Sequence, residues 1–293
     1  FDVTERDIRW FQPRQKLLVA ADPFLFEADE ITYIFFEKVP AGKMLGHIAC
    51  CTYDGHHFSE PEDLHIGPAN LHYSYPFLFR WEKDIYLTVE NYMTGRFMLY
   101  RCTGFPLRWE PVQELFSSPV VDPTIFLHEG KLWLFYTVEG TGHAHSRLYL
   151  RYAHRPEGPW LEHPMNPIKD DITAARPAGA LFTENGKIYR PAQDCSLTYG
   201  HHIVLNEVTQ LSTTHFEEHK LQRLGPLNTA PYTQGLHTIN SNGRYTVVDA
   251  RRICQQRRPL GRIASIVARR ALGALHNGKA ALGALPAVLS FVE

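Results

Sequence analysis

The chain has 293 residues, of which 44% are hydrophobic and 21% charged, and its formal net charge is −1. This composition excludes disordered and collagen-like proteins and is sufficient for one large buried core. The chain begins at Phe1 rather than methionine, so we expect a fragment or a processed chain, and no run of about 18 apolar residues predicts a transmembrane helix.

The charge is distributed unevenly along the chain. Residues 1–250 carry 22 Lys and Arg residues against 30 Asp and Glu residues, whereas residues 251–293 carry eight against one. An acidic body argues against nucleic acid as a partner, because phosphates attract basic surfaces. The five cysteines follow no disulfide spacing and are interpreted as thiols of a reducing compartment, which predicts a cytoplasmic protein.

One hairpin-forming sequence motif recurs along the chain, and it is clearest in residues 120–139. Asp122-Pro123 opens a short apolar strand, Glu129-Gly130 forms a turn, and a strand rich in aromatic and β-branched residues returns. The copies open at Asp22, Tyr75, Asp122, Arg176 and His237, which are 53, 47, 54 and 61 residues apart. A period of this size with strands in each unit predicts a propeller.

A second feature, an aromatic residue in the outer strands of each unit, repeats with a similar period. These aromatic residues are 51, 51 and 56 apart: Phe58, Trp109, Trp160 and Phe216. The sequence therefore predicts an all-β fold, a five-bladed β-propeller over residues 1–254 with blades opening near residues 22, 75, 122, 176 and 237. We expect the segment around Ile8–Phe11 to close the ring as an outer strand of the fifth blade, since closure removes exposed edges.

Residues 255–293 have a different pattern. Apolar residues at helical spacing alternate with Arg262, Arg269 and Arg270, which predicts a short, basic, amphipathic helical tail. Three interpretations stay open: a helix packed on the propeller, a linker to a further domain, or contact with an anionic membrane surface.

The candidate site follows from the ring. The inner strand of each blade lines the central channel, so the opening residues of the repeats are expected to meet at one mouth. Asp22, Asp122 and His237 are candidates for catalysis there, and Glu90 joins them if a bulge or loop redirects it. Candidates for substrate binding are Arg176, whose planar fork suits an anionic group, together with Tyr75, Gln193 and Asp194.

The motifs resemble known families. The Asp-Pro openings, the five repeats and Glu157-Gly158-Pro159-Trp160 resemble the five-bladed propeller glycosidases, which include the arabinanase/xylosidase and invertase/levansucrase families. The stretches 21–26, 75–79 and 235–238 more closely resemble the propeller found N-terminally in glucosamine inositolphosphorylceramide transferases and beside formyltransferase-like domains of bacterial proteins. The resemblance covers about residues 15–252.

The resemblance to the hydrolases implies roles for the residues at matching positions. It implies that Asp22 is the general base or nucleophile and that Asp122 tunes pKa and orients the substrate. In those families a glutamate that opens the fourth blade is the general acid, but Arg176 stands there in this chain. Because glycoside hydrolysis needs one protonated carboxyl, His237 or Glu90 would have to supply the proton.

Two functions remain open on these residues. The first is a glycan-active enzyme that hydrolyses or transfers a glycosidic bond, with an acidic, phosphorylated or amino sugar as substrate. The second is a non-catalytic carbohydrate-recognition domain that accompanies a transferase or formyltransferase domain. No metal or cofactor is expected, because the histidine pairs at 143/145 and 201/202 complete no ligand set and no Gly-rich phosphate loop is present.

Carboxylates also recur near the ends of the returning strands. Glu37, Glu90 and Glu139 occupy this place in the first three repeats. Their repetition favours a structural role, such as binding backbone amides of the neighbouring blade.

Overall fold

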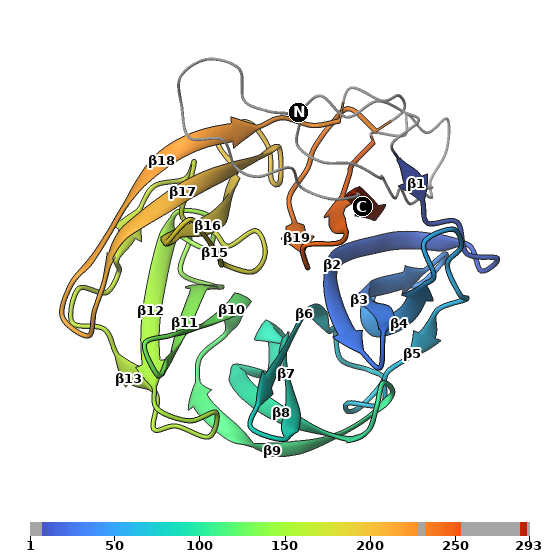
Figure 1. The fold of residues 1–293 in the computed structure, drawn as a ribbon, viewed down its shortest axis with the longest axis horizontal. Helices are drawn as coiled ribbons and strands as arrows, with labels where there is room; N and C mark the ends of the chain where they lie inside the picture. The colour runs from blue at the N-terminus through green and yellow to red at the C-terminus, as the bar shows by residue number, and fades with distance from the viewer. Residues whose placement is uncertain (1–7, 228–231, 253–287, 292–293) are drawn as a thin grey trace.

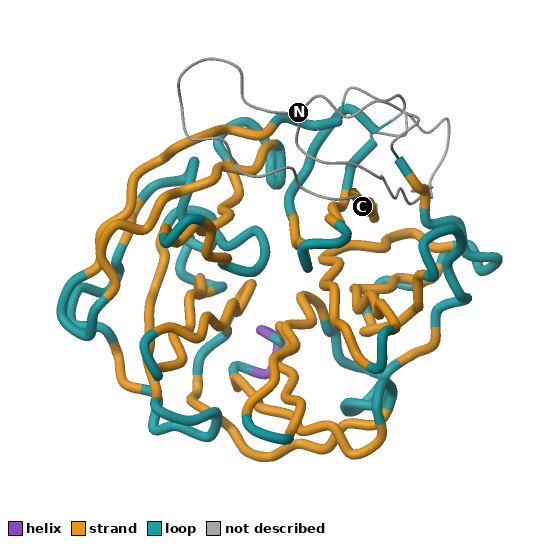
Figure 2. The backbone as a smooth tube through the Cα atoms, in the orientation of Figure 1, coloured by secondary structure: helices purple, strands orange, loops and turns teal. Residues whose placement is uncertain are grey.

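The computed structural model describes residues 8–227, 232–252 and 288–291. The strands form five sheets arranged around a common centre (Figure 1). Figure 2 shows that the described part of the backbone consists of strand and loop apart from a short 3-10 helix, η2 (Tyr92–Thr94). The fold is therefore an all-β propeller. No helix among the described residues is long and apolar enough to cross a membrane.

Four of the sheets are blades of consecutive antiparallel strands. Blade 1 contains β2 (Leu17–Ala28), β3 (Ile31–Pro40), β4 (His47–Tyr53) and β5 (Glu62–Asp63). Blade 2 contains β6 (Ser74–Trp81), β7 (Asp84–Glu90), β8 (Arg96–Gly104) and β9 (Arg108–Ser117). Blade 3 contains β10 (Val120–His128), β11 (Lys131–Val138), β12 (Arg147–Ala153) and β13 (Leu161–Glu162), with β14 (Lys169–Asp170) also paired to β12. Blade 4 contains β15 (Phe182–Glu184), β16 (Lys187–Asp194), β17 (His202–Leu211) and β18 (Phe216–Leu224).

The remaining sheet, which we call the closing sheet, joins the two ends of the chain. Its order is β1 (Arg9–Trp10), β21 (Val288–Phe291), β20 (Thr246–Asp249) and β19 (Ile239–Ser241). Strand β21 runs parallel to both β1 and β20. The expectation of a five-bladed propeller is thus corrected: four sheets are antiparallel blades, and the closing sheet has mixed pairing. The N-terminal segment does lie at its edge, but it pairs with β21.

The predicted helical tail is only partly tested. Residues 253–287 and 292–293 lie outside the described residues, and the described part of that region is the strand β21. For Val288–Phe291 the helical expectation was wrong. The physical reason is that β20 has an edge whose backbone groups need partners, and an apolar segment with strand propensity satisfies it.

A β-bulge marks the opening residue of each of the first three blades. The pairing register shifts at Asp22, Tyr75 and Asp122, and their φ angles are 50°, 48° and 49°. Each precedes a proline, and a left-handed conformation at a non-glycine residue costs about 1–3 kcal/mol. Bulges redirect side chains, so the side chains at these positions are oriented differently from those of regularly paired strand residues.

The core lies at the seams between the sheets. Trp109 packs with Phe35 and Leu87, and Phe216 packs with Phe135. The repeated aromatic residues of the outer strands therefore fill the spaces between neighbouring blades. Trp160 has the same role at the seam between blades 2 and 3. These aromatic side chains hold the blades together and leave the centre of the ring to polar residues.

Candidate active site at the channel mouth

A cavity of about 270 Å³, which we call the mouth cavity, lies at the centre of the ring. Four of the five residues that open the repeats line it: Asp22, Asp122, Arg176 and His237. Glu90 lines it as well, at the end of β7. Segments that are far apart in the sequence thus converge as the repeat period predicted, while the chemical roles assigned to these residues remain predictions.

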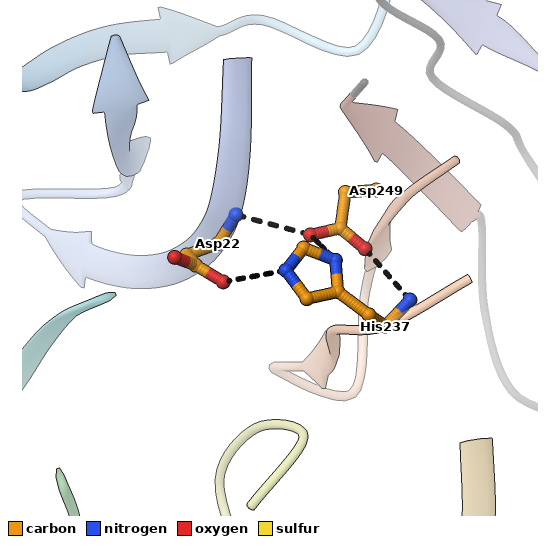
Figure 3. Close-up of side chains that lie close together, drawn as sticks. All are labelled: Asp22, His237 and Asp249. Carbon is orange, nitrogen blue, oxygen red and sulfur yellow. Dashed lines mark hydrogen bonds and ion pairs between the residues drawn. The ribbon is translucent and has the colours of Figure 1, made fainter. Parts of the chain in front are cut away.

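Asp22, His237 and Asp249 form a hydrogen-bonded triad on one side of the cavity (Figure 3). His237 Nδ1 lies 2.7 Å from Asp249 Oδ2, and His237 Nε2 lies 3.3 Å from Asp22 Oδ1. The Thr238 hydroxyl also donates to Asp22 Oδ1, at 2.9 Å. All three members of the triad are buried, so water contributes little to their solvation.

Asp22 is held in its ionised form by this arrangement. Burial alone would raise the pKa of its carboxyl, but the hydrogen bond and charge of His237, assisted by Thr238, bring that pKa below its ordinary value. A carboxylate that stays ionised in a buried site can accept a proton or hold a polar ligand group.

Asp122 and Arg176 form a buried ion pair that also lines the cavity. Arg176 Nε donates to Asp122 Oδ2 at 2.6 Å, and Gln193 Nε2 donates to the same oxygen at 2.8 Å. Burial raises the pKa of Asp122 and the positive charge of Arg176 opposes this effect. The guanidinium also lies 4.8 Å from the centre of the Tyr199 ring. Arg176 is therefore committed largely to Asp122.

Glu90 has the opposite electrostatic environment to Asp22. Burial and the negative charge of Asp122 raise the pKa of Glu90 well above its ordinary value, so the carboxyl is neutral over a wide pH range. Its Oε2 accepts the backbone N–H of Asp122 at 3.0 Å. The recurring glutamates were expected to bind backbone amides of the neighbouring blade, and Glu90 makes such a bond.

The other two recurring glutamates differ. Glu37 Oε1 lies 3.6 Å from His72 Nε2 at the cavity wall, and Glu139 accepts the N–H of its own neighbour, Gly140. The neighbouring-blade bond recurs instead at Asp249, whose Oδ2 accepts the N–H of Asp22 at 3.1 Å. An acid at the end of a returning strand thus holds the bulged aspartate of the next sheet in two places.

The structure places three predicted binding residues away from the cavity surface. Tyr75 is fully buried, and its hydroxyl contacts Thr124 and accepts the N–H of Gly179. Asp194 accepts the N–H and hydroxyl of Ser196 and pairs with Arg223. Gln193 is also fully buried and reaches the site only through Asp122. Their contacts support the bulges and turns around the cavity, and a role for them in ligand binding stays a prediction.

Several lining or supporting residues were missed. Asp249 ends the returning strand of the last repeat, as Glu37 and Glu90 do in theirs, so its position was a usable signal. Tyr199 and His72 reach the cavity from loops, where no periodic pattern marks them.

The triad is also the place where a metal ion has to be considered. The ligand atoms of Asp22, His237 and Asp249 lie within 4.8 Å of one another, the one such group among the described residues. However, Asp249 already accepts four hydrogen bonds, from His237 Nδ1 and from the backbone N–H groups of Asp22, His237 and Thr238. This full set of donors fits a proton-linked triad better than a ligand set with carboxylates turned toward an ion.

The fold is shared with carbohydrate-active propellers. The catalytic domain of a family 62 α-L-arabinofuranosidase from Coprinopsis cinerea superposes with a TM-score of 0.62 and 11% identity, covering 98% of this chain and 96% of that one. A family 117 glycoside hydrolase from Zobellia galactanivorans superposes with a TM-score of 0.56 and 14% identity, covering 74% and 75%. Likeness at such low identity establishes the propeller architecture.

Sequence similarity is more specific. Residues 15–257 match the family described as glucosamine inositolphosphorylceramide transferase 1, N-terminal, and the chain belongs to this family. The transferase of that name from Oryza sativa subsp. indica is 36% identical over 204 residues, which are 68% of this chain and 27% of the relative. The matched region thus spans about a quarter of the curated relative's length.

Proposed function

We propose that the mouth cavity binds a sugar unit of a glycoconjugate and acts on its glycosidic bond, with Asp22 as the base and Glu90 as the acid. One observation carries this proposal: the pKa values of two buried carboxyl groups in one cavity are shifted in opposite directions. The shift favours the ionised form of Asp22 and the neutral form of Glu90. Such a division is the usual arrangement for acid–base work on a glycosidic bond.

The proposal assigns supporting roles to the other lining residues. Arg176 occupies the place of the hydrolases' acid and pairs with Asp122, and we assign the proton donor to Glu90, at the end of β7 in blade 2. The closing sheet contributes Asp249 to the site from β20, and His237 lies just before its strand β19.

The family supports a glycoconjugate as the ligand. The relatives are named as transferases acting with glucosamine and inositolphosphorylceramide, and a sugar of such a conjugate is the ligand we propose here. At about 270 Å³ the cavity is slightly smaller than typical pockets of about 300–1,000 Å³, which suits a single sugar unit.

A second function is favoured by the Asp122–Arg176 pair. An arginine at the usual acid position, already held by a carboxylate, is more useful for orienting a ligand than for proton transfer. In this alternative the propeller is a recognition domain that presents a glycan to a transferase or formyltransferase domain.

Turnover of a panel of amino-sugar and uronic-acid glycosides tests the choice. We expect turnover by the unsubstituted chain and a loss of about 10²–10⁴-fold in Asp22→Asn and in Glu90→Gln, with ligand binding retained. Asp171→Asn removes a turn-capping carboxylate outside the mouth cavity and serves as the matched control. Equal turnover by the unsubstituted chain and Asp22→Asn rejects Asp22 as the base, and binding without turnover by either selects the recognition domain.

A further inference from the structure

The geometry of the triad constrains where its hydrogens lie. Both ring nitrogens of His237 face a carboxylate oxygen, at 2.7 Å on the Nδ1 side and 3.3 Å on the Nε2 side (Figure 3). A neutral imidazole has one N–H donor and one bare nitrogen, whereas the imidazolium has two donors. If Asp22 is ionised, a neutral ring would direct a lone pair at a carboxylate on one side.

The hydrogen bonds of Asp249 show whether His237 Nδ1 carries a hydrogen atom. Its Oδ1 accepts the backbone N–H groups of His237 and Thr238, at 3.1 and 2.8 Å, and its Oδ2 accepts the N–H of Asp22. Every one of these partners is a donor, so the side chain is an acceptor at both oxygens. His237 Nδ1 therefore carries hydrogen.

The surroundings of Asp22 bear in the same way on whether His237 Nε2 carries a hydrogen atom. Its Oδ1 already accepts the Thr238 hydroxyl, and the positive charge of Arg176 also favours the carboxylate. We propose that His237 is held as an imidazolium cation between Asp22 and Asp249, and that Asp249 is the positioning residue that fixes this state. The use of the cation in catalysis rests on the proposed function, but its protonation does not.

The remaining surroundings of His237 are compatible with a cation. From the loop between β16 and β17, the Tyr199 ring packs against the imidazole with centroids 5.2 Å apart. The Asp122–Arg176 pair is neutral overall, and the buried thiol of Cys195 is uncharged because burial raises its pKa. Among these groups, the carboxylates of Asp22 and Asp249 are the negative charges in direct contact with the ring.

The proposal links ring closure to the site. Asp22 and Asp249 are 227 residues apart, and a single carboxylate holds both the bulged backbone of β2 and the ring of His237. The imidazolium in turn keeps Asp22 ionised beside the ligand. Asp249 thus acts on the base through His237 and does not need to touch the sugar.

Heteronuclear NMR of the histidine ring nitrogens in the full chain tests this protonation directly. Signals are assigned by their loss in His237→Gln. We expect both nitrogens of His237 to be protonated near pH 7. A bare Nε2 or a bare Nδ1 in the unsubstituted chain overturns the proposal. So does a change of these signals on adding a metal chelator, because a cation at Nε2 would then explain the geometry.

Two substitutions are expected to produce opposite neutral tautomers. In Asp249→Asn the amide group opposite Nδ1 is a donor, so hydrogen remains on Nε2 only. In Asp22→Asn the charge facing Nε2 is lost, so hydrogen remains on Nδ1 only. Asp171→Asn, outside the cavity, is expected to leave both nitrogens protonated. The same tautomer in both variants contradicts the proposal, and either folded variant suffices if the other does not fold.

Kinetics give a second readout once a turned-over glycoside is known. Asp249→Asn is expected to lower kcat by on the order of 10²-fold with little change in KM, because the tautomer is wrong while the cavity is intact. A change in KM alone contradicts a positioning role. Absence of any turnover by the unsubstituted chain contradicts the proposed function and leaves the NMR result to decide the protonation of His237.

Discussion

At the scale of single residues, the neighbours of a carboxyl group decide its chemistry. Asp22 and Glu90 both lie buried on the mouth cavity, so burial disfavours the charge of each. His237 and Thr238 offset this effect for Asp22, whereas the charge of Asp122 reinforces it for Glu90. The same cavity therefore favours the carboxylate form of Asp22 and the neutral form of Glu90.

This difference has a measurable effect on stability. Because the pKa of Glu90 is raised above its ordinary value of 4.5, its contribution to stability is fully present below about pH 4.5 and is lost as pH rises through the raised pKa. Glu90→Gln stays neutral, so the chain should lose free energy of unfolding relative to this variant, by up to about 1.4 kcal/mol per pH unit. Urea unfolding at several pH values measures the difference, and parallel curves would contradict the raised pKa.

At the scale of elements, the seam between blade 4 and the closing sheet depends on direct backbone contact. The N–H of Ile239 donates to the carbonyl of Ala178 at 2.8 Å, and the next residue, Gly179, has φ of 128°. A Cβ at this position would lie 2.0 Å from the Ile239 carbonyl oxygen. Only glycine allows the two backbones to approach so closely.

Gly179→Ala is therefore expected to destabilise the protein strongly. The left-handed conformation alone costs alanine about 1–2 kcal/mol, and the clash with backbone adds about 1–3 kcal/mol. Gly186→Ala is the matched control, because Gly186 also has positive φ but a Cβ there meets open space. Chemical denaturation compares the two. Equal losses in both variants would show that the seam tolerates the extra atom.

At the scale of the whole molecule, the ring is closed by residues from the two ends of the described chain. Phe11 is 1% exposed and packs edge-on against Phe36 and Phe58 of blade 1. The same cluster contains Tyr245 and Val247 of the closing sheet. Closure thus depends on apolar burial between segments more than 230 residues apart, in addition to the strand pairing of β1.

We expect Phe11→Ala to lower the free energy of unfolding by about 3–5 kcal/mol, as for other fully buried aromatic residues. Leu127→Ala, at a residue that is 54% exposed, is the control and should change stability by less than about 0.5 kcal/mol. Thermal and urea unfolding of both variants measure the effect. A loss below 1 kcal/mol for Phe11→Ala would contradict its role in closure, since single surface substitutions approach that range.

Much of the architecture and part of the site could be predicted from the sequence. Each hairpin is encoded locally by an opening residue, a turn and a returning strand, and the repeat period places the opening residues on one axis. Asp22, Asp122, Arg176 and His237 were expected together for this reason, and all four line the mouth cavity. Tyr75 obeyed the same pattern, but neighbouring side chains enclosed it.

Local patterns determined the propeller, because strand period, turn residues and spacing are properties of short segments. Only the tertiary structure decided that β21 pairs with β1 and β20, and that Asp249 reaches Asp22 across the closed ring. Only the tertiary structure shifted the pKa values of Asp22 and Glu90 in opposite directions. The reason is physical: hydrogen bonds between distant segments and the burial of charge depend on what the folded chain places around each group.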